Sequence, residues 1–213
     1  MTTMNNRIEL KHPLAAHHLS ILRDIDTPPH LFRSQVQLLA MLLAVEATAD
    51  LALVDVEVKT PICPMIGKRL LQRVAIVPIL RAGLGLVDPI FQLLPNAEVW
   101  HLGMYRDEAT ARPVEYYCKL PADRPADVGM VLDPMLATGG SIRMAITALK
   151  RWGVKDIRVL SVIASEQGIQ TLHSEFPDAK VFVAAVDPDL NDHKFIVPGL
   201  GDAGDRMFNT QRP

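Results

Sequence analysis

Short apolar runs alternate with amphipathic segments from residue 73 onward, and this pattern restricts the fold more than any other feature. The strand candidates occupy residues 74–77, 97–104, 128–132, 157–163 and 181–186. Segments with helical spacing of apolar residues lie between them, at 84–94, 141–152 and 167–175. Parallel strands buried on both faces read as apolar runs, and their connections are usually helices. The pattern therefore predicts an α/β fold: a three-layer domain with a mainly parallel sheet flanked by helices.

The segments outside this core are expected to be additions to it. Two N-terminal helices are predicted at 13–25 and 30–50 from the helical spacing of their apolar residues. Residues 53–62 alternate apolar and charged side chains, which indicates a half-exposed strand or β-arm. Residues 114–119 alternate weakly and suggest part of a hairpin or flap. The last part, 187–213, is rich in glycine, proline and aspartate and indicates a structured loop region.

The length, composition and net charge of the chain disfavour several classes of protein. The 213 residues are 49% hydrophobic and 22% charged, so we expect one domain spanning 1–213. The formal net charge of −2 disfavours non-specific nucleic-acid binding, which needs a basic surface. No run of about 18 apolar residues is present, so no membrane span is expected. Two isolated cysteines, Cys63 and Cys118, and no apolar run behind Met1 favour a cytoplasmic location.

The sequence VGMVLDPMLATGGSI, residues 128–142, carries the strongest chemical signal. An apolar strand ends at Asp133, a short loop follows, and a helix is predicted to begin at Thr138-Gly-Gly-Ser141. Glycines let backbone N–H groups approach an anion closely, hydroxyls add donors, and a helix N-terminus carries partial positive charge. The segment therefore indicates a phosphate site, in which Asp133 could hold ribose hydroxyls directly or through a metal ion.

The same residues also fit a plainer interpretation. Thr138 or Ser141 would then be only the N-cap of an ordinary strand-to-helix turn. The segment is not a P-loop, because it lacks the Gly-Lys-Ser/Thr that such a loop requires. From the residues alone, both interpretations stay open.

The strand–Asp133–loop–TGGS arrangement resembles the phosphoribosyl pyrophosphate (PRPP) loop of the type I phosphoribosyltransferases. Most members have two adjacent acids here, whereas the Asp133-Pro134 form resembles the uracil-specific branch. VPILRAGLG at 77–85 resembles the pyrophosphate loop of that branch, and FIVPGLGDAGDR at 195–206 resembles its uracil loop. The resemblance covers nearly the whole chain. It implies a PRPP site that includes Asp133, Pro134, Met135, Leu136, Ala137, Thr138, Gly139, Gly140 and Ser141.

This resemblance to the uracil phosphoribosyltransferases implies a reaction and its partners. The 5-phosphoribosyl group of PRPP would be transferred to N1 of uracil, giving UMP and pyrophosphate in pyrimidine salvage. Residues 73–186 would bind PRPP, and 187–210 would bind uracil. Mg²⁺ is expected to arrive with PRPP rather than at a dedicated protein site. The family further implies a homo-oligomer, a dimer or a tetramer, and makes GTP a candidate effector.

Two arginines are candidates for stabilising the departing pyrophosphate. A guanidinium offers a planar fork of donors that stays charged at any working pH. Arg81 and Arg106 are therefore expected to be catalytic and to bind PRPP, although an arginine is more often a solvated surface charge. Residues 106–112 form a polar stretch that we expect to close over PRPP as a mobile flap. The family also implies a cis peptide at Leu80–Arg81.

The C-terminal glycine loop is expected to read the base. The resemblance assigns uracil contacts to main-chain groups of Ile196, Gly201, Asp202 and Ala203, and it places the Asp202 side chain near PRPP and the reacting N1, as a third catalytic residue. A plainer interpretation is that the glycines only shape a tight turn. The loop also matches the dinucleotide pattern G-x-G-x-x-G at 199–204, but Pro198 precedes it and no strand–helix–strand unit follows.

The sequence departs from the pattern of the resembled family at residues 165–167, 194 and 195. Phe195 stands where Tyr is expected, Lys194 where glycine is common, and Ser165-Glu-Gln-Gly168 replaces an expected Ala-Pro-Glu-Gly. Two other functions therefore stay open: a phosphoribosyltransferase for another base, and a catalytically weak regulatory module that senses PRPP or UMP. The Asp133-Pro134 form and the glycine loop disfavour the first. The presence of Arg81, Arg106 and Asp202 disfavours the second.

Overall fold

The computed structural model describes the backbone of residues 6–106, 113–118 and 124–210. Side chains are described in these ranges except in 102–106 and 113–118. Within these ranges, no helix is long and apolar enough to cross a membrane.

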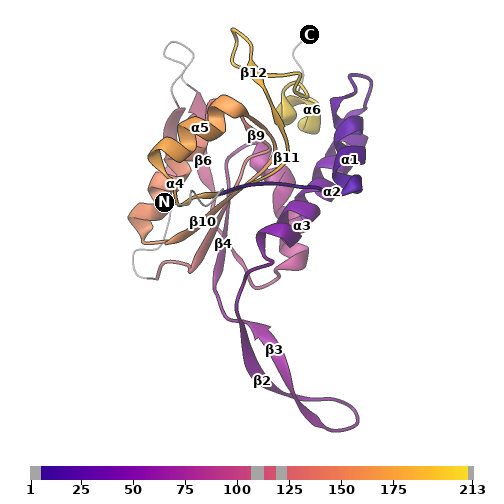
Figure 1. Cartoon of the computed structure of the whole chain (residues 1–213), viewed down its shortest axis with the longest axis vertical. Helices are drawn as coiled ribbons and strands as arrows, with labels where there is room; N and C mark the ends of the chain where they lie inside the picture. Colours follow the sequence, from indigo (N-terminus) through magenta and orange to yellow (C-terminus); the bar gives the residue numbers. More distant parts are fainter. Residues whose placement is uncertain (1–5, 107–112, 119–123, 211–213) are drawn as a thin grey trace.

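A parallel sheet forms the centre of the molecule (Figure 1). Every strand pairing in it is parallel. Its strands run in the order β1 (Arg7–Glu9), β11 (Lys180–Asp187), β10 (Asp156–Ser165), β8 (Val128–Leu132), β4 (Val74–Pro78) and β5 (Glu98–Val99), and β9 (Met135–Leu136) pairs with β10. The predicted mainly parallel sheet is therefore confirmed. The three-residue strand β1 was not predicted, because so short a segment carries no periodicity.

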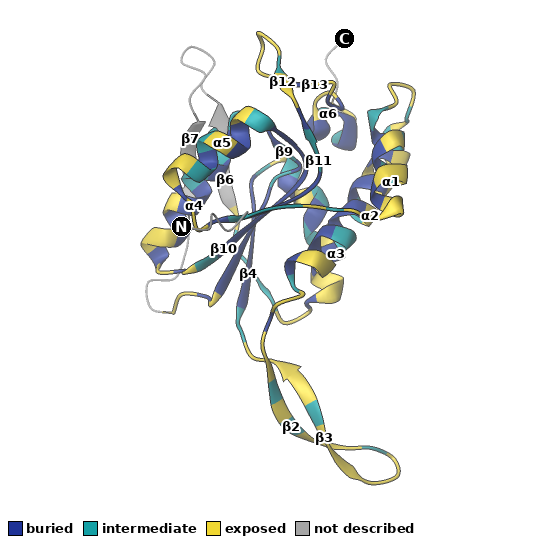
Figure 2. Cartoon of the chain, viewed as in Figure 1, coloured by how far each residue is buried: buried dark blue, intermediate teal, exposed yellow. Residues whose placement is uncertain are grey.

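Helices cover both faces of the sheet and complete three layers (Figures 1 and 2). Side chains alternate along each strand, so Ile76 joins the core on one face while Ala75 and Val77 join the core on the other. The first face is covered by α1 (Pro13–Arg23), α2 (Pro29–Ala47) and α3 (Val87–Leu93). The second is covered by α4 (Gly140–Trp152) and α5 (Glu166–Glu175). The N-terminal helices are thus one of the layers and not additions, because β4, β8 and β10 are apolar on both faces.

Two predicted elements are divided in the structure. The helix expected at 84–94 is a 3₁₀ turn, η1 (Ala82–Leu86), followed by α3, since two glycines in the turn weaken an α-helix. The strand expected at 97–104 is β5 in the central sheet and β6 (Leu102–Arg106) in a separate antiparallel pair with β7 (Pro113–Cys118). The hairpin suggested at 114–119 is thereby confirmed.

A two-stranded arm projects from the sheet, away from the helices (Figure 1). It consists of β2 (Leu53–Lys59) and β3 (Pro64–Leu70), which pair along their whole length. The predicted β-arm is confirmed, but its second strand was missed because its apolar residues do not alternate. Figure 2 shows the arm almost wholly exposed. Apolar side chains are exposed along it, among them Leu53, Val58, Ile62, Met65 and Ile66.

The C-terminal region contains more regular structure than its composition indicates. A small antiparallel pair, β12 (Asp189–Leu190) and β13 (Ile196–Val197), precedes the helix α6 (Ala203–Phe208). Asp202 is the N-cap of α6, and its side chain accepts a hydrogen bond from the Asp205 N–H at 2.9 Å. This helix was not predicted, because glycines dominate the segment that leads into it.

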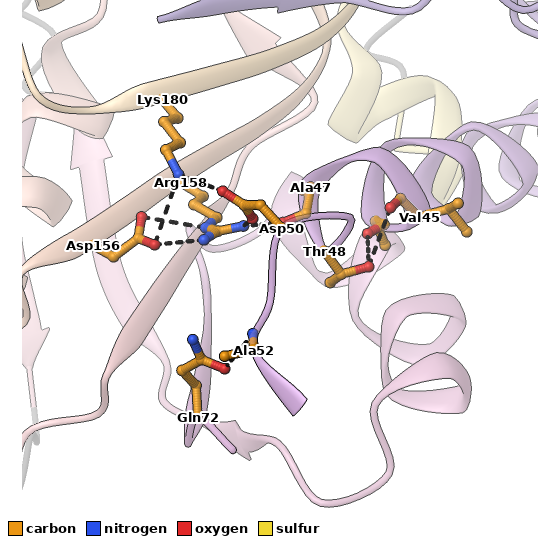
Figure 3. Close-up of polar contacts among 10 residues, drawn as sticks. Val45, Ala47, Thr48, Asp50, Ala52, Gln72, Asp156, Arg158 and Lys180 are labelled. Carbon is orange, nitrogen blue, oxygen red and sulfur yellow. Dashed lines mark hydrogen bonds and ion pairs between the residues drawn. The ribbon is translucent and has the colours of Figure 1, made fainter. Parts of the chain in front are cut away.

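A buried arginine fastens α2 to the sheet (Figure 3). The Arg158 side chain on β10 is 2% exposed and ion-paired with Asp50 and Asp156. It also donates to the Ala47 carbonyl at the end of α2, at 2.5 Å. Lys180 on β11 donates to Asp50 at 2.8 Å. This hydrogen bond, together with Arg158, holds the pKa of Asp50 below its usual value against the opposing effect of burial.

We expect Arg158→Met to lower the free energy of unfolding by about 2–4 kcal/mol, because it removes a buried charge shared by two carboxylates and a carbonyl. Lys68→Met is the control, since Lys68 pairs with Asp55 on the exposed arm, and such pairs contribute about 0–1 kcal/mol. Urea unfolding at neutral pH measures both variants. Equal losses of unfolding free energy in the two variants would show that the Arg158 ion pairs contribute no more to stability than an exposed pair.

Candidate active site

The loop after β8 is fixed to the sheet by its backbone. The Pro134 carbonyl accepts hydrogen bonds from the N–H groups of Val162 and Ile163, each at 3.1 Å. The next two residues form β9, which pairs with β10. Asp133 stands directly after the last residue of β8, as predicted, at the carboxyl end of a central strand. Ligands of open α/β sheets bind at this position.

The loop ends in a helix that has no side-chain cap. Gly139 is the N-cap of α4, with the positive φ of 80° that favours glycine, and as a glycine it supplies no side-chain cap to the first turn. The first intrahelical bond runs from the Arg143 N–H to the Gly139 carbonyl at 2.9 Å. The interpretation of Thr138 or Ser141 as an ordinary N-cap is therefore wrong. Uncapped N–H groups at a helix start are a ready site for phosphate.

A serine ties the loop to α5. Ser165 is buried at the end of β10, and its Oγ donates to the Ala137 carbonyl at 2.6 Å. The same Oγ accepts from the Gly168 N–H at 2.8 Å, which makes Ser165 the N-cap of α5. Ser165 stands where the family pattern has alanine, and its hydroxyl makes two hydrogen bonds that an alanine could not make.

One cavity of about 230 Å³ brings the predicted loops together. Asp133, Met135 and Ala137 contribute from the loop after β8, and Ala82 contributes from the turn after β4. The C-terminal region contributes the residues predicted to bind the base, which are Ile196, Gly201, Asp202 and Ala203. Segments far apart in the sequence thus meet at the carboxyl ends of the strands.

Other predicted residues lie elsewhere. Pro134 and Leu136 belong to the loop after β8, but they are buried and do not line this cavity. Residues 138–141 do not line it either. Arg81 is 61% exposed in its side chain, and it pairs with Asp205 at 3.1 Å. The peptide bond Leu80–Arg81 is cis, as the resemblance implied. Arg106 ends β6, but its side chain and the expected flap at 107–112 lie outside the described residues.

The carboxyl group of Asp133 is unusual. It lies deep in the cleft and keeps only partial contact with solvent. Burial raises the pKa of Asp133 to about 7, with a further contribution from the charge of Asp202. The hydrogen bond that Asp133 accepts from the Met135 N–H at 3.3 Å acts in the opposite direction. Two carboxyl groups therefore face one cavity, and the pKa of one of them, Asp133, is raised to about 7.

Five lining residues were not among the predicted site residues: Ala82, His193, Lys194, Phe195 and Gly204. Lys194 has a φ of 64°, which favours glycine, so its departure from the family's glycine falls at a strained position. The Asn191 side chain accepts from the Phe195 N–H at 2.9 Å and holds this turn in place. The unusual residue types at 194 and 195 were a usable signal, whereas nothing in the sequence pointed to His193.

The dinucleotide pattern at 199–204 has no dinucleotide-binding context. It follows the two-residue strand β13, which pairs in antiparallel fashion with β12, and it leads into the six-residue helix α6. The pattern requires a parallel strand–helix–strand unit. Two of its glycines, Gly201 and Gly204, instead line the cavity.

The fold is that of the type I phosphoribosyltransferases. A hypoxanthine phosphoribosyltransferase from Trypanosoma cruzi has this fold, with a TM-score of 0.50, 7% identity, and coverage of 74% of this chain and 75% of that one. A protein of known structure from Aquifex aeolicus is far more similar, with a TM-score of 0.92, 35% identity, and coverage of 97% and 100%.

Sequence comparison gives the particular family. The family model described as uracil phosphoribosyltransferase matches residues 9–210. A uracil phosphoribosyltransferase of Roseiflexus sp. (strain RS-1) is 55% identical over 94% of this chain and 96% of the relative. Another from Agathobacter rectalis is 51% identical over 98% of this chain and 100% of the relative. The chain belongs to the uracil phosphoribosyltransferase family.

Proposed function

We propose that this protein transfers the 5-phosphoribosyl group of PRPP to N1 of uracil in the cavity described above, forming UMP and pyrophosphate. The observation that carries the proposal is the meeting of Asp133, Ala82 and Asp202 around one cavity, each from a different predicted loop. The family membership supports the same reaction. The reaction returns free uracil to the nucleotide pool.

PRPP binds along the loop from Asp133 to Ser141. Asp133 accepts hydrogen bonds from the ribose hydroxyls, and the uncapped N-terminus of α4 binds the 5′-phosphate with its N–H groups. Arg81 and Arg106 bind the pyrophosphate and stabilise the charge that builds up as it leaves. Arg81 exchanges its pairing with Asp205 for the substrate, which its exposed position allows.

Uracil binds against the C-terminal loop. The base offers the acceptor, donor and acceptor of O2, N3–H and O4. Main-chain groups of Ile196, Gly201 and Ala203 read this edge, and the carboxylate of Asp202 lies beside the reacting N1. A backbone N–H aimed at O4 would meet an amino group in cytosine, and unpaired buried polar groups can give discrimination of about 10⁴–10⁵.

Mg²⁺ accompanies PRPP and neutralises charge on its phosphates. Among the described residues, no group of three or more His, Cys, Asp or Glu could hold a metal ion. Asp133 and Asp202 are the two carboxylates that line the cavity, and they fit a metal ion that keeps most of its ligands from substrate and water. Both residues position the substrate whether or not they contact the ion.

The resemblance and the exposed arm support a homo-oligomer. Ile62 at the tip of the arm is 92% exposed and Ile66 is 58% exposed, and such apolar surface favours contact with another subunit. A dimer or tetramer, activation by GTP and a cytoplasmic location remain predictions.

A sensor that binds PRPP or UMP without turnover is the alternative function, and the assay below distinguishes it.

We expect the wild type to form UMP from labelled uracil, PRPP and Mg²⁺. Asp202→Ala and Arg106→Ala are each expected to lower kcat/KM by about 10²-fold, because each removes charge or a donor from the transition state. Asp192→Ala is a control, because Asp192 is exposed and lies just before the first cavity-lining residue of this turn, His193. If the wild type binds PRPP or UMP but turns over neither uracil, cytosine nor a purine, the sensor becomes the better proposal.

A further inference from the structure

The loop that faces uracil is held from outside the cavity by a partly buried ion pair. Arg23, the last residue of α1, donates to both carboxylate oxygens of Asp187, at 2.8 and 2.6 Å. The side chains are 25% and 6% exposed. The same pair binds the backbone of Gly199. The Gly199 carbonyl accepts a hydrogen bond from Arg23 at 2.8 Å, and the Gly199 N–H donates one to Asp187 at 3.0 Å. Both backbone groups of one loop residue are therefore fixed by one ion pair.

A second arginine holds the next residue. The Arg206 guanidinium donates to the Leu200 carbonyl at 2.7 Å. It also donates to the carbonyls of Leu22 at 2.6 Å and Asp24 at 2.5 Å, where α1 ends, and it lies over the Phe32 ring at 4.4 Å. Burial lowers the pKa of Arg206, although the charge of Asp24 opposes this shift. The end of a helix is a favourable place for such a cation.

Gly199 has a backbone conformation and close surroundings that only glycine fits. Gly199 has a φ of 63°, and a Cβ there would lie 2.1 Å from the Ile196 carbonyl oxygen. The residues immediately after Leu200 line the cavity. A shift of Gly199 or Leu200 would therefore be passed along the backbone to Gly201 and Asp202.

We propose that Arg23, Asp187 and Arg206 are positioning residues for base recognition. Together they form a clamp that sets the distance between the uracil-reading main chain and the PRPP loop. This proposal depends on the proposed function, in which uracil binds against residues 196 and 201–203. The PRPP loop is fixed by separate contacts, through Pro134 and Ser165. Loosening the clamp should therefore weaken binding of uracil much more than binding of PRPP, which only Asp202 of the displaced residues approaches.

Arg23→Ala tests the clamp by steady-state kinetics. We expect the KM for uracil to rise at least about tenfold, since geometry errors near 1 Å can cost about 10²-fold, while the KM for PRPP stays within about twofold. The preference for uracil over cytosine should fall in parallel. Arg23→Lys keeps the charge but loses the two-pronged contact, so it should recover part of the loss. This milder variant also serves if Arg23→Ala does not fold.

Arg158→Met is the matched control, because Arg158, like Arg23, is an arginine whose side chain pairs with a carboxylate and also donates to a backbone carbonyl. It lies near the start of β10, whereas Asp187 ends β11, so the two clusters are at opposite ends of a parallel sheet. We expect Arg158→Met to lower stability without changing the ratio of the two KM values.

Two outcomes separate the proposals. A folded Arg23 variant whose KM values for uracil and PRPP change equally, or not at all, would overturn the clamp while the wild type still makes UMP. A wild type that makes no UMP would overturn the proposed function and the clamp with it.

Discussion

Asp133→Asn is expected to abolish most UMP formation and, at about pH 8, to make the free protein more stable. These opposite effects follow from one property. The carboxyl group sits at the end of β8 in a cleft where burial raises its pKa to about 7. The charge that the reaction uses is therefore one that the folded protein without substrate carries at a cost. Loss of the carboxylate that we propose holds the ribose should lower kcat/KM by about 10³-fold.

The direction of the stability change follows from proton binding. The pKa of Asp133 is raised from 3.8 in the unfolded chain to about 7 in the folded protein. Between these values the folded state holds more protons, so stability falls as pH rises, and the full cost is present above about pH 7. Asparagine cannot ionise and avoids this cost. We expect Asp133→Asn to gain about 1–3 kcal/mol at pH 8, and the gain to shrink as the pH falls towards 4.

Urea unfolding from about pH 5 to pH 8 measures this difference, beside activity assays. Asp26→Asn is the control, because it makes the same change at an exposed carboxyl group. The control should show neither the pH-dependent gain nor the loss of activity. A gain for Asp133→Asn that is the same at every pH would contradict the raised pKa.

The sequence predicted the parts of this site that depend on local pattern. Asp133 could be placed because an apolar strand ends just before it, and the glycines after it indicated the start of a helix. The raised pKa of Asp133 could not be predicted, because it arises from burial and from Asp202, which is distant in the sequence. Residue identity alone does not give the local dielectric or the distance between two acids.

Long-range contacts account for most of what the sequence left open. Arg23 and Asp187 are 164 positions apart, and nothing in either neighbourhood indicates that they meet around Gly199. The helices α1 and α2 were predicted from their periodicity, but not as one layer of the fold, because periodicity does not say which surface covers the apolar stripe. The helix α6 was missed for a local reason: its N-cap, Asp202, is surrounded by glycines that disfavour a helix.

Gly168→Ala is expected to damage the PRPP loop without changing any residue in it. A Cβ at Gly168 would lie 2.2 Å from the Ala137 carbonyl oxygen and 3.0 Å from that of Leu136. Both atoms are backbone of the loop, so neither can turn aside as a side chain could. The loop must move by roughly 1 Å, and the hydrogen bond from Ser165 to Ala137 must stretch or break.

We expect Gly168→Ala to lower kcat/KM for PRPP by about 10²–10³-fold and the free energy of unfolding by about 1–3 kcal/mol. Gly67→Ala on the exposed arm is the control, because its Cβ would meet the end of the Val58 side chain at 2.4 Å, and this side chain can rotate. Kinetics with varied PRPP and urea unfolding measure both variants. An unchanged KM for PRPP in a folded Gly168→Ala protein would show that the loop can shift without loss. In that case the position of the Ala137 carbonyl, and with it the tether from Ser165, does not set the geometry of the phosphate site.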